Sequence, residues 1–119
     1  MSTPAPVGGF SNGAKVIVLY NGAVTVAGTV TGSAVNIIGG NRVDLQVVVD
    51  QPATPNPLTV RLQFSNDQVN WAEGPTLVTA NVQDVNEMRQ LPMMGSYVRM
   101  QATGENAGRV SVRLIGVLK

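Results

Sequence analysis

The sequence contains neither cysteine nor histidine. Without cysteine the chain can form no disulfide and carry out no thiolate chemistry, and without histidine it lacks the commonest general base and metal ligand. Enzyme chemistry would therefore depend on its seven Asp and Glu residues. Asp44 and Asp50 share one face of an expected strand but lie about 20 Å apart along it, too far for the paired carboxylates of a glycosidase-like site. We expect a protein that is not an enzyme and needs no cofactor or metal.

Charge is also scarce. Charged residues make up 13% of the chain, about half the usual share in a soluble domain. The net charge of +1 gives no basic surface of the kind that binds nucleic acid. Six of the eight cationic residues are Arg, which suits a surface covered by neighbouring subunits. An ordinary β surface made soluble by Thr, Asn, Gln and Ser would explain the same composition.

Long apolar runs are absent too, so we expect neither a membrane span nor a signal peptide, and synthesis in the cytoplasm. A chain of 119 residues suits one domain. Residues 1–13 are rich in Pro, Gly and Ser and predict an extended arm, followed by a single domain over residues 14–119. Val7 and Phe10 could dock this arm on a neighbouring subunit. A frayed terminus is the alternative.

Apolar residues alternate with polar ones along most of the domain, with no sustained helical repeat. This pattern predicts an all-β fold, an antiparallel β-sandwich of the jelly-roll or Ig-like kind with seven to nine strands. The clearest strands cover residues 42–50 and 58–65. The second should direct Val60, Leu62 and Phe64 inward. Between the two strands, three prolines in residues 51–57 predict a stiff crossover from one sheet to the other.

Asn21-Gly22 is the strongest short hairpin signal, because a type I′ turn needs positive φ at both central residues. It predicts a hairpin between residues 14–20 and 23–31, with Leu19 opposite Val24 on the core side. The other side then carries the apolar residues Val16, Val18 and Tyr20. An apolar outer side indicates a partner, or a cover formed by the arm or a loop of the same chain.

A second hairpin is expected to join residues 97–103 to residues 109–118 across 104–108. In the last strand, Val110, Val112 and Leu114 share a phase that is broken near Gly116, which predicts a bulge there.

Polar residues at alternating positions of three expected strands could lie on one sheet face: Arg61, Gln63, Arg99, Gln101, Ser111 and Arg113. Arg and Gln offer forked, directional hydrogen bonds. Such a face could contact the carboxylates and backbone carbonyls of another protein. A solvated sheet face is the alternative.

Trp71 is the single tryptophan and follows a polar turn. We expect it to plug one end of the core, although it could instead stack on a sugar ring. Ser65, Asn66, Asp67 and Asn70 could offer oxygen ligands to Ca²⁺, but their spacing is not that of an EF-hand, and a turn without metal is favoured.

Three segments carry a family resemblance: the strand 58–65 with Ser65-Asn66-Asp67 and Trp71 after it, the strand beginning Tyr97-Val98-Arg99, and the closing strand 109–118. They resemble the small all-β structural proteins of tailed bacteriophage particles. The resemblance implies a virion component, most simply a head decoration (cement) protein that binds the major capsid protein or other virion subunits, as a homo-oligomer or as lattice-bound copies. A tail or neck component is the alternative within this resemblance. A glycan-binding module that uses Trp71 is a hypothesis of a different class.

Overall fold

The computed structural model describes residues 15–24, 28–51, 58–79, 84–104 and 110–119. These ranges form nine strands and contain no helix, and so none long and apolar enough to cross a membrane. The strands are β1 (Lys15–Val24), β2 (Gly28–Thr31), β3 (Val35–Asn36), β4 (Arg42–Asp50), β5 (Leu58–Ser65), β6 (Ala72–Val78), β7 (Asp84–Pro92), β8 (Tyr97–Gly104) and β9 (Val110–Leu118).

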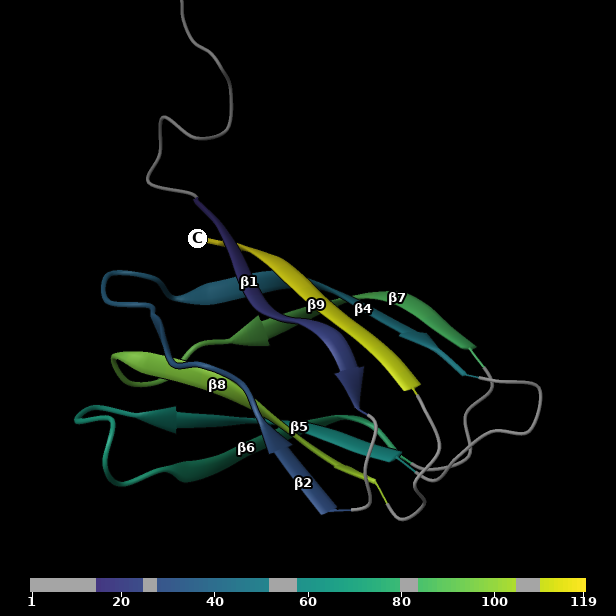
Figure 1. Cartoon of the computed structure of the whole chain (residues 1–119). Helices are drawn as coiled ribbons and strands as arrows, with labels where there is room; N and C mark the ends of the chain where they lie inside the picture. Colours follow the sequence, from purple (N-terminus) through teal and green to yellow (C-terminus); the bar gives the residue numbers. More distant parts are fainter. Residues whose placement is uncertain (1–14, 25–27, 52–57, 80–83, 105–109) are drawn as a thin grey trace, which may run out of the picture.

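The strands form two antiparallel sheets that pack face to face (Figure 1). The four-stranded sheet has the order β1-β9-β4-β7, and the five-stranded sheet has the order β2-β8-β5-β6, with β3 also paired to β8. The pairs β1 with β9, β2 and β3 with β8, β4 with β7, and β5 with β6 are those of one long hairpin rolled into two sheets. This is the jelly-roll topology. The predicted all-β sandwich is confirmed, and its Ig-like alternative is wrong.

The core lies between the sheets and is built by strict alternation. In β4, Val43, Leu45, Val47 and Val49 are all fully buried. In β5, Val60 and Leu62 are fully buried and Phe64 is nearly so, as predicted. Each strand places every second side chain on the same face, so one face of each sheet is apolar and meets the other sheet.

The Asn21-Gly22 hairpin is wrong. β1 runs straight through this dipeptide, with Asn21 opposite Arg113 and Gly22 opposite Val112 of β9, while β2 lies in the other sheet. Neither residue has the positive φ that a type I′ turn requires. Instead of turning at this dipeptide, β1 continues to pair with β9 as far as Val24, which is buried.

β1 contains a bulge that the sequence did not reveal. Val18 pairs with Ile115 and Tyr20 with Leu114, so Leu19 is an extra residue in β1. The extra residue reverses the in-and-out phase, and Tyr20 lies on the inner side, partly buried against the core. The outward placement of Tyr20 is therefore wrong. Its hydroxyl donates a hydrogen bond to the carbonyl oxygen of Ala23 at 2.9 Å.

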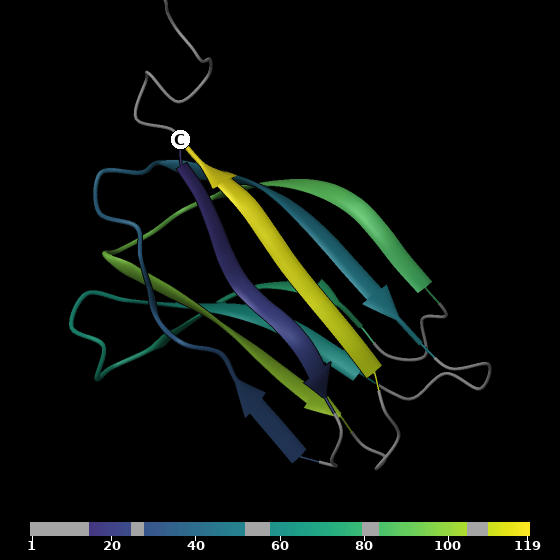
Figure 2. The same cartoon turned by 45° about the horizontal axis from the view of Figure 1, so that its top comes forward.

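The second predicted hairpin is wrong as well, because β8 and β9 lie in different sheets (Figure 2). The bulge predicted at Gly116 is also wrong. β9 pairs with β4 without a register shift from Ser111 to Leu118, and Gly116 stands at an inward position. A Cβ atom there would overlap a methyl group of Val43 and come within 3.3 Å of Leu45. Glycine is therefore required here because there is no room for a side chain, and not because the strand bends.

The predicted crossover and arm fall largely on residues that the structure does not describe. Residues 52–57 are among these, but β4 and β5 on either side of them belong to different sheets, as the crossover requires. The arm at residues 1–13, with Val7 and Phe10, lies outside the described residues.

Candidate functional site

The five-stranded sheet carries a connected polar cluster on its outer face, which we call the Arg99 network: Arg61, Gln63, Trp71, Glu73 and Arg99. The register of β5 places Gln63 between Arg99 of β8 and Glu73 of β6. Arg99 donates from Nε to Gln63 Oε1 at 2.8 Å, and Gln63 Nε2 donates to Glu73 Oε2 at 2.9 Å. Arg61 donates to Glu73 Oε1 at 3.2 Å. The neighbouring strands thus close the network around Gln63, which is only 5% exposed.

The charge distribution in this network is uneven. The amide of Gln63 and the guanidinium of Arg61 hold the pKa of Glu73 below its usual range, and Arg99 adds a weaker effect through its charge. Glu73 is therefore a stable carboxylate, occupied by Gln63 and Arg61. Among the described residues, no carboxylate lies within ion-pair distance of Arg99.

Trp71 is not the expected core plug. It is partly exposed directly before β6, and Arg99 lies over its ring, with Cζ 4.1 Å from the ring centroid. This is a cation–π arrangement. Its position beside Gln63 and Glu73 is polar, as the glycan hypothesis requires, but Arg99 occupies one face of the ring.

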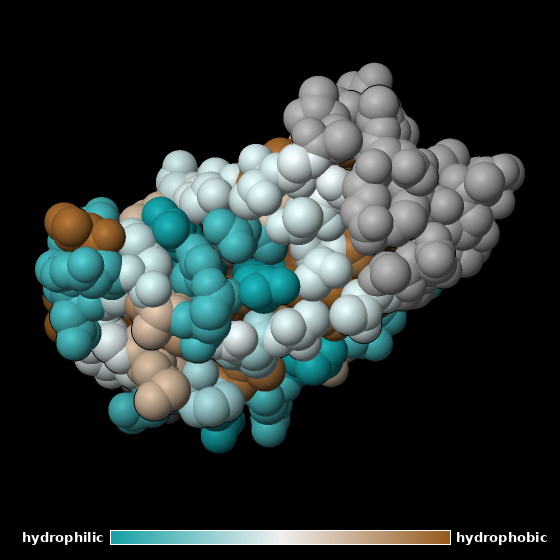
Figure 3. All heavy atoms as spheres, turned by 90° about the horizontal axis from the view of Figure 1, so that it is seen from below, coloured by the Kyte–Doolittle hydropathy of each residue, from teal (hydrophilic) through white to brown (hydrophobic). Residues whose placement is uncertain are grey.

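The surroundings of the network are also polar. Cross-strand pairs on the same face join Thr29 to Thr103, Thr59 to Thr103 and Arg61 to Gln101. Figure 3 shows the corresponding side of the molecule, with hydrophilic residues in the middle and residues of intermediate hydropathy beside them. The structure thus brings Arg61, Gln63, Arg99 and Gln101 together, as predicted.

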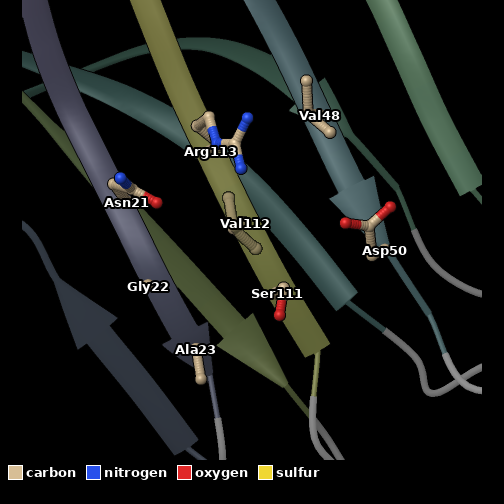
Figure 4. A pocket seen from close by; sticks show the side chains of 8 residues that line it. All are labelled: Asn21, Gly22, Ala23, Val48, Asp50, Ser111, Val112 and Arg113. Carbon is tan, nitrogen blue, oxygen red and sulfur yellow. The ribbon is translucent and has the colours of Figure 1, made fainter.

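Ser111 and Arg113 do not join this face. They belong to β9, on the outer face of the opposite sheet, because β9 pairs with β1 and β4. There they line a shallow groove of about 330 Å³ together with Asn21 of β1 and Asp50 of β4 (Figure 4). The single polar face predicted from the sequence is therefore divided between two sheets.

An apolar patch lies on the same outer face, formed by Val16, Val18, Ile115 and Val117. Val16 pairs with Val117 and Val18 with Ile115, so the four side chains form a block across β1 and β9. Val16 is 55% exposed and Val18 is 51% exposed. The two β9 residues are partly exposed. A compact exposed apolar block of this kind is typical of a contact surface.

The turn after β5 is organised by its own side chains. Asp67 Oδ1 accepts hydrogen bonds from the backbone N–H groups of Val69 and Asn70 and from the hydroxyl of Ser65. The bonds from Asn70 and Val69 contribute most to a pKa of Asp67 far below the usual range of a carboxyl group. Within the described ranges, no cluster of three or more acidic residues could hold a metal ion. The carboxylate of Asp67 therefore stabilises the turn.

Three exposed apolar side chains in loops were not identified from the sequence. Ile38, Val69 and Met94 are each more than 60% exposed. Their loops meet at one end of the sandwich, where Ile37 donates to the carbonyl of Ser96, and Ser96 donates to that of Ser65. Isolated apolar residues in polar loops are a weak signal, since single exposed apolar side chains are common.

No family model and no curated protein matches this chain. A chain in the structure of infectious bursal disease virus Gx strain has a similar fold, with a TM-score of 0.51 and 10% sequence identity. The similarity covers 88% of this chain and 32% of that chain, so this chain spans about a third of its length. At this identity, the likeness shows a shared fold alone.

Proposed function

We propose that this chain is a structural component of a virus particle, most simply a decoration protein on the capsid of a tailed bacteriophage, and that it is not an enzyme. The observation that carries the proposal is the apolar patch beside the edge strand β1. The virus chain with the same fold and the frequent use of jelly rolls in capsids support it.

The four edges of the two sheets are protected to different degrees. The β7 edge carries Asp84, Glu87, Arg89 and Pro92, the β6 edge carries Glu73 and Pro75, and β2 and β3 are only four and two residues long. Charges, prolines and short length prevent an edge strand from pairing with other chains. β1 has ten residues and a single charge, Lys15. We infer that a neighbouring subunit covers β1 and the apolar patch.

The carboxylates support a role without catalysis. The ammonium of Lys119 lowers the pKa of Asp44, and the hydrogen bonds described above lower those of Asp67 and Glu73. A general acid at neutral pH needs a raised pKa instead. These three carboxyl groups are engaged in holding loops and strands.

Immunogold electron microscopy tests the proposal directly. Antibodies against the purified chain should label intact particles from cultures of the organism that encodes it. Label on heads supports a decoration protein, and label on tails or necks supports a tail or neck component. Particles without label in cultures that express the chain would refute a virion role.

A binding assay with isolated heads tests the surface. We expect Val18→Asp to abolish cosedimentation with heads, since it places a charge in the apolar patch. Ile38→Asp adds the same charge to an exposed apolar side chain elsewhere, and it should bind normally. Equal binding by both variants would exclude the patch as the contact.

A glycan-binding module is the second candidate, favoured by the partly exposed Trp71 beside polar side chains. It predicts quenching or a shift of the tryptophan fluorescence on titration with oligosaccharides, together with a monomer in solution. The absence of any such change across neutral and acidic oligosaccharides would exclude it.

A further inference from the structure

Arg99 is held in place before any partner arrives. Its Nε–H is bonded to Gln63 and its guanidinium carbon lies over the Trp71 ring. Gln63 is in turn fixed by Glu73, and is nearly buried. An arginine normally loses considerable rotamer freedom when it binds, and a fixed one loses less.

The other edge of the same guanidinium is unused. Arginine has five N–H donors, and four of them are on the two terminal Nη atoms. No hydrogen bond between described residues uses these four donors, and the Nε side already has its acceptor. The two Nη atoms form the fork that binds both oxygens of a carboxylate.

The charge of this fork is also available. Arg61 and Glu73 form an ion pair with each other, while Arg99 has no carboxylate partner among the described residues. Arg, Trp and Tyr are the residue types that dominate binding energy in protein interfaces. Arg99 and Trp71 lie together on this face, and Tyr97 precedes Arg99 by two residues, on the same side of β8.

We infer that the outer face of the five-stranded sheet is a second contact surface, on which Arg99 binds an acidic side chain of a protein partner through its two Nη atoms. The inference rests on the proposed function only in taking the partner to be a protein. We assign the carboxylate to a protein rather than to an acidic sugar, because Arg, Trp and Tyr occur together here as they do in protein interfaces, and because Arg99 occupies one face of Trp71 on which a sugar could stack.

The test is a titration of ¹⁵N-labelled protein followed by NMR, with an acetylated, amidated tetraglutamate peptide as the probe. We expect saturable shifts of the Arg99 Nε–H and Trp71 indole N–H signals. Tetraglutamine, and sodium chloride at matched ionic strength, should not reproduce them. Shifts that are linear, or equal with salt alone, would overturn the inference.

Variants of Arg99 distinguish binding through the two Nη donors from binding through positive charge alone. Arg99→Lys keeps the charge but loses the fork and should weaken peptide binding at least fivefold, and Arg99→Gln should abolish the indole shift. Arg113→Gln removes an exposed arginine from the opposite sheet and should bind as the unmodified protein does. Amide spectra check that each variant is folded. Unchanged binding by Arg99→Lys would refute the fork.

A parallel titration with oligogalacturonate addresses the other class of ligand. Tighter binding of the acidic sugar than of the peptide would overturn the assignment to a protein partner. The peptide result is independent of the labelling of particles, so this inference and the virion role can fail separately.

Discussion

Gly116→Ala provides the sharpest test of the sheet geometry. An open and an inward position of Gly116 in β9 predict changes of opposite sign in the free energy of unfolding. If Gly116 occupied an open position without positive φ, alanine would stabilise the protein by about 0.5–1 kcal/mol through the unfolded state. In the structure, the backbone of Gly116 does not have positive φ, so alanine adds no backbone strain. The added methyl group, however, points inward and overlaps the Val43 side chain.

The expected magnitude follows from this overlap. Inserting a methyl group into a well-packed core costs about 1–3 kcal/mol. After subtraction of the backbone gain, Gly116→Ala should lower the free energy of unfolding by about 1–2 kcal/mol. Near 4 °C per kcal/mol for a domain of this size, the melting temperature should fall by about 4–8 °C.

A double-mutant cycle identifies the cause. Val43→Ala alone removes two methyl groups and should cost about 2–3 kcal/mol, from the lost burial and the cavity left behind. The methyl group that Gly116→Ala adds would then enter that space, so the double variant should be about 1–2 kcal/mol more stable than additivity predicts. Urea denaturation of the four proteins measures all terms. A neutral or stabilising Gly116→Ala, or strict additivity, would refute the inward position.

Further predictions concern the surface. Trp71→Ala should fold and lower the free energy of unfolding by about 1–2 kcal/mol in thermal denaturation, whereas a core plug would cost about 3–5 kcal/mol. The pKa of Asp67 is lowered in the folded state, so its contribution to stability is complete above the unfolded pKa near 4 and is lost as the pH falls toward the folded value. The urea midpoint should therefore drop between about pH 7 and pH 3, and Asp67→Asn should reduce that drop; an equal drop in the variant would contradict this. Val18→Asp should change the urea midpoint little, since the side chain is exposed.

The sequence predicted well those features that depend on burial of one strand face. β4 and β5 have the predicted bounds, because Val43 to Val49 and Val60 to Phe64 alternate without interruption. Alternation states which side of a strand is buried, but it does not state which strand lies beside it. Both predicted hairpins were wrong for this reason. The jelly roll pairs β1 with β9, two strands that most of the sequence separates, so neither strand pairs with its neighbour in the sequence.

The candidate site was predicted only in part, for a related reason. Arg61, Gln63, Arg99 and Gln101 were placed together correctly, since β5 and β8 are adjacent. The sequence could not show that Arg113 lies in the other sheet, because Arg113 occupies an outward position of its strand whichever sheet that strand joins. The inward turn of Tyr20 depends on the extra residue Leu19, which no local pattern marks. Likewise, the stacking of Arg99 on Trp71 requires the register of three strands at once.

The place of β9 in the middle of its sheet has a consequence for how the chain folds. β9 lies between β1 and β4, yet it follows both in the sequence. During synthesis, β5, β6 and β8 can pair as they leave the ribosome, whereas β1 finds its partner strand only when Val110 and the residues after it have emerged. Until then the apolar side chains of β1, including Ile17 and Val24, remain open to other chains. Such long-range pairing slows folding and lengthens the time during which aggregation competes. High-level expression of this chain should therefore benefit from chaperones that hold β1 until β9 has been made.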